Sequence, residues 1–154
     1  MPKLSQDVLM KQSAKMAIDM TAKMFGMKPE TVAKILQVGI PMQMKLISEN
    51  PEVAKQMYAA SFKMMPEEVQ NFYKKLAQDA KAAGVTKEQY QAMFGASIGA
   101  INEAAAEAAG VTPEQAADVM AATAPAVQEG VKEEAEAAGV KDAAGFAKWA
   151  GKQA

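Results

Sequence analysis

Apolar and polar positions follow one another along this chain with the period of an α-helix. From residue 5 to about residue 25, apolar residues gather on one face of a helical wheel and charged residues on the other. The apolar face consists of Leu9, Met10, Ser13, Met16, Ala17, Met20 and Met24, and the charged face of Lys11, Lys15, Asp19 and Lys23. From Pro29 onward, the same period forms the inner side of a second helix with Val32, Ile35, Leu36 and Ile40. Ser5 can cap the first helix, and further helices are predicted from Pro51 and Met65. The pattern predicts an all-α fold.

A short turn that contains glycine recurs between the predicted helices. In each copy, the glycine supplies the left-handed residue that ends one helix. The second and third copies are also capping boxes, because Gln89 and Gln115 follow Thr86 and Thr112 by three residues. A shorter copy begins at Gly139, where Asp142 can cap a terminal helix. The three full copies are Gly26-Met27-Lys28-Pro29-Glu30-Thr31, Gly84-Val85-Thr86-Lys87-Glu88-Gln89 and Gly110-Val111-Thr112-Pro113-Glu114-Gln115.

Prolines recur with the turns. Pro41 follows Pro29 by 12 residues, and Pro125 follows Pro113 by the same interval. A proline inside a helix removes one hydrogen bond and clashes with the preceding turn, so each unit is expected to be kinked or broken at its middle. We therefore predict a single domain over residues 1–154, built from about three Gly-x-Thr/Lys-Pro-Glu-capped repeats of kinked helices that share one core.

The stretch from Phe25 through Pro41 to Asn50 resembles the opening of the YidB-type bacterial family of unknown function. In that family, a Gly-hydrophobic-Ser/Thr-x-Glu turn precedes an alanine-rich helix that ends at a proline, and a step containing asparagine follows. The stretch from Gly110 to Pro125 is similar to the same pattern. The resemblance implies an all-helical bacterial protein, and it brings no catalytic residues.

The composition argues against most enzyme chemistry. The 154 residues include no histidine and no cysteine, which are the commonest general base, metal ligand and thiol nucleophile. No catalytic, cofactor-binding or metal-binding residue is therefore assigned, and no cofactor is expected. Carboxylate pairs at helical spacing, such as Glu103 with Glu107 and Glu114 with Asp118, are expected on a solvated surface.

The ends and the charges of the chain bear on its location and partners. The N-terminus carries Lys3 and Asp7 where a signal peptide needs an apolar segment, and no run reaches the roughly 18 apolar residues of a spanning helix. A cytoplasmic protein without a membrane span is expected. All 17 basic residues are lysines, so arginine-mediated recognition of phosphates and guanines is missing and specific nucleic-acid binding is not expected.

The charge is distributed unevenly between two parts of the chain. Residues 1–82 are rich in methionine and carry 12 lysines against 8 carboxylates, whereas residues 83–154 are rich in alanine and carry 5 lysines against 10 carboxylates. The difference can reflect no more than solvated helix faces. It can also make two regions attract each other, within one molecule or between neighbours.

Methionines supply the most distinctive candidate surface. Met16, Met20 and Met24 repeat at every fourth residue, Met27 follows them, and Met42 with Met44 adds to the set. Soft copper(I) ligation is disfavoured, because no cysteine or histidine strengthens the site. Two interpretations stay open. The thioethers can line a pliable groove for an apolar partner, or they can fill the core or a subunit interface.

Phe146 and the only tryptophan, Trp149, form an aromatic pair near the end of the sequence. The pair can dock on the core of its own chain. Alternatively, it can anchor a neighbouring subunit, because buried aromatic side chains supply much of the energy of protein interfaces.

Together these features predict a non-enzymatic structural protein that self-associates into a homo-oligomer. In this hypothesis, the basic half of one subunit meets the acidic half of another, head to tail, with Phe146 and Trp149 as anchors. The alternative is a binding module whose methionine-lined groove takes an apolar partner such as a helix, a lipid or a granule surface.

Overall fold

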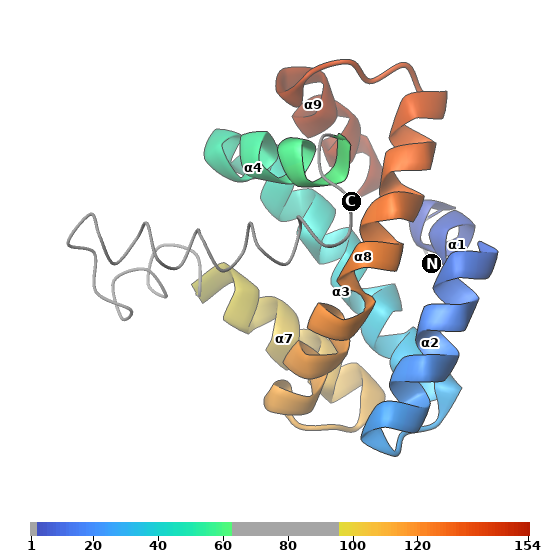
Figure 1. The fold of residues 1–154 in the computed structure, drawn as a ribbon. Helices are drawn as coiled ribbons and strands as arrows, with labels where there is room; N and C mark the ends of the chain where they lie inside the picture. Colours follow the sequence, from blue (N-terminus) through green and yellow to red (C-terminus); the bar gives the residue numbers. More distant parts are fainter. Residues whose placement is uncertain (1–2, 63–95) are drawn as a thin grey trace, which may run out of the picture.

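The computed structural model describes residues 3–62 and 96–154, and every regular element within them is an α-helix (Figure 1). The all-α prediction is therefore confirmed. The helix predicted from Met65 and the turn copy at residues 84–89 lie outside the described residues. The helices are α1 (Lys3–Leu9), α2 (Gln12–Phe25), α3 (Pro29–Glu49), α4 (Pro51–Phe62), α7 (Ala96–Ala109), α8 (Pro113–Ala137) and α9 (Ala143–Gln153).

Helix α3 is the central element, because it contacts each of the other described helices. Its buried side is the one that the periodicity predicts. The core that it organises draws residues from all the described helices. Figure 1 shows α1 and α2 alongside α8, and α4 together with α9 at one end of the molecule. The four predicted inner residues of α3, each at most 1% exposed, are Val32, Ile35, Leu36 and Ile40.

The first predicted helix is wrong in one respect, because it is two helices. Helix α1 ends at Leu9, and Lys11 adopts an extended backbone (φ −68°, ψ 145°) before α2 begins. Ser5, predicted as a cap, lies inside α1 and is fully buried. The break allows α1 to pack on α8 and α3, where Val8 is fully buried. Tertiary packing therefore overrides the continuous helical pattern.

The glycine turns have the predicted left-handed conformation, with φ of 64° at Gly26, 70° at Gly110 and 82° at Gly139. The residue after each glycine donates its N–H to the carbonyl five residues earlier and packs on the core. This is the Schellman arrangement, in which the residue after glycine makes a hydrophobic contact. The hydrogen bonds are 2.8 Å from Met27 to Ala22, 3.0 Å from Val111 to Ala106 and 3.1 Å from Val140 to Ala135.

Two predicted helix caps are confirmed. Thr112 Oγ1 accepts from the N–H of Gln115 at 3.2 Å, and Gln115 Oε1 accepts from the N–H of Thr112 at 2.9 Å. Asp142 Oδ1 accepts from the N–H of Gly145 at 2.6 Å and so begins α9. These bonds satisfy N–H groups that have no partner inside the helix.

Neither internal proline ends its helix. Pro41 lies inside α3 and Pro125 inside α8, and both helices continue past the proline. Of the predicted kink or break, the break is therefore absent at both positions, and the kink stays a prediction. Buried residues precede and follow each proline, such as Ile40 and Met44 in α3, so packing on both sides offsets the roughly 3 kcal/mol that an internal proline costs. The three-repeat arrangement stays a prediction, since its middle copy lies outside the described residues.

Candidate functional site

Three methionines of α2 form an exposed apolar surface, which we call the methionine face. Met16 is 57% exposed, Met20 64% and Met24 66%. Met10, in the turn between α1 and α2, is a further exposed methionine at 70%. These are unusual exposures for large apolar side chains that repeat on one helix, and such surfaces mark interaction sites.

The methionine face points outward because α2 buries its opposite side. That side packs on α8 and α3 through Ala14, Ile18, Thr21 and Ala22, all at most 7% exposed. The charged row of Lys15, Asp19 and Lys23 runs beside the methionine face and is also exposed. The interpretation of these methionines as core residues is therefore wrong. The structure instead places these methionines on an exposed surface with lysines along its edge.

The other methionine candidates do not belong to this face. Met27 is the partly buried residue that follows Gly26 and packs on the core. Met42 is half-buried on α3, and Met44 is a core residue at 3% exposure. The three exposed methionines thus lie on the outer side of a single helix. The candidate methionines identified from the sequence are therefore divided between surface and core.

Phe146 docks on the core of its own chain. It is 1% exposed, and its ring centroid lies 6.0 Å from that of Tyr58 and 5.9 Å from that of Phe62, both on α4. The Tyr58 hydroxyl donates to the Lys141 carbonyl at 2.7 Å and ties α4 to the loop before α9. Phe146 is therefore buried within the chain and removed from any exposed surface. Its role is to hold α9 against α4.

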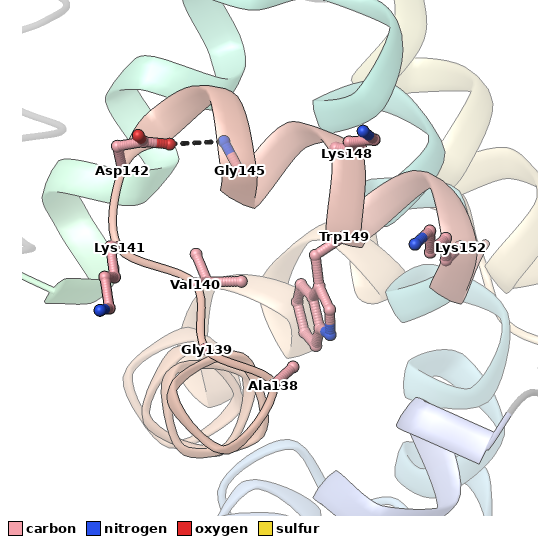
Figure 2. A pocket seen from close by; sticks show the side chains of 9 residues that line it. All are labelled: Ala138, Gly139, Val140, Lys141, Asp142, Gly145, Lys148, Trp149 and Lys152. Atoms are coloured by element: carbon pink, nitrogen blue, oxygen red, sulfur yellow. Dashed lines mark hydrogen bonds between the residues drawn. The ribbon is translucent and has the colours of Figure 1, made fainter.

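Trp149 is only partly buried, and it borders an open depression between α9 and the end of α8. Its ring lies 5.9 Å from Phe146 at an interplanar angle of 20°. Figure 2 shows the indole directed away from α9 toward Ala138 and Val140. The depression has a volume of about 380 Å³. Lysines border it at Lys141, Lys148 and Lys152.

An ion pair joins the N-terminal helices to the acidic part of the same chain. Lys11 Nζ lies 2.8 Å from Glu133 Oε2 and 3.1 Å from Glu134 Oε1. The hydrogen bond to Glu133, followed by that to Glu134, raises the pKa of Lys11 above its usual range. Part of the attraction between the two halves of the chain is therefore intramolecular.

The carboxylate pairs expected on the surface are there. Glu103 and Glu107 on α7 are exposed, as are Glu114 and Asp118 on α8. Within residues 3–62 and 96–154, no group of three or more Asp or Glu residues is placed to hold a metal ion. In the same residues, none of the helices combines the length and the hydrophobicity that a transmembrane span requires.

Comparisons with protein-family models, curated proteins and solved structures gave no match. The resemblance to the YidB-type family stays a prediction.

The lysine border of the depression was not predicted from the sequence. The sequence contains one indication of this border, because Lys148 and Lys152 lie one turn apart on either side of Trp149. Lys141 could not be added from the pattern, because it reaches the same depression only through the turn that Gly139 begins.

Proposed function

We propose that this protein is a non-enzymatic structural protein whose subunits associate head to tail. The methionine face of one subunit would pack against α7 and α8 of another, with the lysines beside the face near the exposed carboxylates of those helices. The observation that carries the proposal is the exposure of Met16, Met20 and Met24, each more than half exposed on one helix face.

The charges beside the methionine face favour an acidic partner surface. Lys15 and Lys23 border the face, with Asp19 between them. Residues 96–137 carry one lysine and eight carboxylates, among them the exposed pairs of α7 and α8. Exposed alanines on α8, such as Ala121 and Ala122, follow Asp118 and leave room for long methionine side chains. Complementary charge would set the orientation of the contact and raise its rate of formation.

The expected association is weak and sensitive to salt. Burying three methionine side chains would contribute on the order of 3–6 kcal/mol. Association costs an estimated 4–15 kcal/mol in lost freedom, so the methionines alone are insufficient and surrounding contacts must add to them. Charged contacts at an exposed border are screened at high salt.

Light scattering after gel filtration, at low and at high salt, tests the proposal. The parent protein should form oligomers whose mass falls as salt rises. Replacement of Met16, Met20 and Met24 by glutamine, which keeps side-chain length, should give a monomer. Reversal of Glu114 and Asp118 to lysine should also give a monomer. Reversal of Glu30 and Glu49, which are exposed on α3, changes the net charge equally and should leave the mass unchanged.

Mixing the two monomeric variants separates a head-to-tail contact from a symmetric one. The glutamine variant keeps an intact acidic surface, and the charge-reversed variant keeps an intact methionine face. A head-to-tail contact joins unlike surfaces, so the mixture should form a dimer with one copy of each variant. A parent that is monomeric at both salt concentrations would contradict the proposal.

The alternative is that the methionine face binds an apolar partner of another kind, such as a helix, a lipid or a granule surface. Flexible thioether side chains repack around differently shaped apolar partners, which favours this second candidate. A parent protein that stays monomeric and binds an apolar dye through Met16, Met20 and Met24 would support it.

A further inference from the structure

The depression beside Trp149 has the composition of a small binding site. Ala138, Val140 and the Trp149 indole form an apolar floor, and Lys141, Lys148 and Lys152 stand around it. Figure 2 shows Lys141 on the loop side of the depression and the other two lysines on the α9 side. Its volume of about 380 Å³ falls within the range of small-molecule sites, roughly 300–1,000 Å³.

The local charge is opposite to that of the preceding helices. Residues 138–154 carry three lysines and one aspartate, whereas residues 96–137 carry one lysine and eight carboxylates. The aspartate is Asp142, whose carboxylate is occupied as the cap of α9. Within residues 3–62 and 96–154, ion pairs form only at Lys11, so the three lysines around the depression have no carboxylate partner there.

Lys152 lies in the last turn of α9, where the helix dipole favours a cation, but two other features of these lysines are unfavourable for the helix. Lys148 and Lys152 are one turn apart, a spacing at which like charges repel on a helix. Lys141 precedes the N-terminus of α9, where the helix dipole favours anions rather than cations. A bound anion would reduce the repulsion between Lys148 and Lys152 and the unfavourable interaction of Lys141 with the helix dipole. Neither arrangement of charge is needed to pack α9 on the apolar core.

Trp149 adds a preference for a flat ring. Phe146 stacks on the indole from the core side, and Figure 2 shows the indole bordering the depression. Aromatic rings stack on exposed tryptophan, and nearby cations hold an attached negative group. We propose that this depression binds a small planar aromatic anion, with its ring against Trp149 and its carboxylate or phosphate directed to the lysine border. This proposal is independent of the association through the methionine face.

The single tryptophan makes the test direct, because the chain has only one indole N–H signal in a proton–nitrogen correlation spectrum. Benzoate and phenyl phosphate would be titrated into the full-length protein. Saturable shifts of the Trp149 indole signal and of the Gly139 and Gly145 amides are expected with at least one of them. The tighter of the two identifies the negative group.

Variants separate a built site from nonspecific attraction. Each exposed ion pair contributes about 0.2–1 kcal/mol, so replacing Lys148 and Lys152 by alanine should weaken binding roughly 2- to 30-fold. The matched control replaces the exposed Lys34 and Lys45 of α3 and should leave the affinity unchanged.

Three results would overturn the proposal. The first is the absence of a saturable shift with either aromatic anion. The second is equal affinity for benzyl alcohol, which has the ring without the charge. The third is an equal shift with acetate or inorganic phosphate, which would indicate an adventitious ion only.

Discussion

Gly130 of α8 lies directly against Val8 of α1. A Cβ atom at Gly130 would come within 2.9 Å of Val8 Cγ1 and 3.5 Å of Val8 Cβ. Val8 is fully buried and β-branched, so it has little freedom to move aside. The glycine therefore sets how closely α1 approaches α8.

Gly130→Ala should destabilise the protein in spite of alanine's better helix propensity. Overpacking costs about 1–3 kcal/mol, against a gain of about 1 kcal/mol from propensity. A net loss of up to about 2 kcal/mol is expected in urea unfolding. Gly39→Ala is the matched control. Its Cβ would lie 2.7 Å from the flexible end of Met120, which can swing away, so the change should be near neutral. Equal losses from both substitutions would contradict this account.

The sequence predicts the inner side of α3 well and that of α2 poorly. In α3, apolar residues occupy one side, so Ile35 and Ile40 can have only one orientation. In α2, methionines occupy one side and Ala14, Ile18 and Ala22 the other, so the periodicity supports two orientations. The choice depends on packing against α8, which is distant in the sequence. Small and β-branched residues fit that close contact better than methionine does.

Two methionines should therefore respond differently to the same change. Met44→Ala should cost about 2–5 kcal/mol, because Met44 is 3% exposed in the core. Met20→Ala should change the free energy of unfolding by no more than about 0.5 kcal/mol, because its side chain is 64% exposed. Urea unfolding of the monomer, at low protein concentration, measures both. A large loss from Met20→Ala there would mean that the methionine face is already covered within the chain.

Phe146 fixes α9 to α4, so Phe146→Ala should cost about 3–5 kcal/mol. Tyr58→Phe keeps the ring and removes only the hydrogen bond to the Lys141 carbonyl, for an expected loss of about 0.5–1.5 kcal/mol. Hydrogen exchange provides a second measurement. Faster exchange confined to α9 is expected in Phe146→Ala, and unchanged protection would show that other contacts hold this helix.

The candidate sites differ in how far the sequence predicts them. The methionine face is visible in the spacing of three residues, although its exposure is not. The depression is only partly visible, because Trp149 and its lysine neighbours are local to α9 while Ala138 and Val140 belong to the end of α8 and its turn. Its shape follows from the left-handed Gly139, which ends α8 and begins the turn to α9, and α9 then packs on α3 and α4.

The ion pairs of Lys11 should make stability depend on pH at the alkaline end. The pKa of Lys11 is raised by Glu133 first and by Glu134 second, so the folded state binds the proton more tightly than the unfolded state. The resulting stability is present below the unfolded-state pKa and is lost as pH rises through the folded-state pKa. Lys11→Met should be less stable than the parent at neutral pH by no more than about 1 kcal/mol.

The two proteins should approach equal stability only above pH 10.5, the usual pKa of lysine. Methionine keeps most of the apolar stem of lysine, so the comparison isolates the effect of the charge. Groups that titrate in both proteins contribute equally and cancel in the difference in stability. Lys15→Met is the matched control, because Lys15 is exposed and forms no ion pair with the described residues. Its difference from the parent should stay flat across the same pH range. A deficit in Lys11→Met that persists unchanged above pH 10.5 would assign the role of Lys11 to packing rather than to charge.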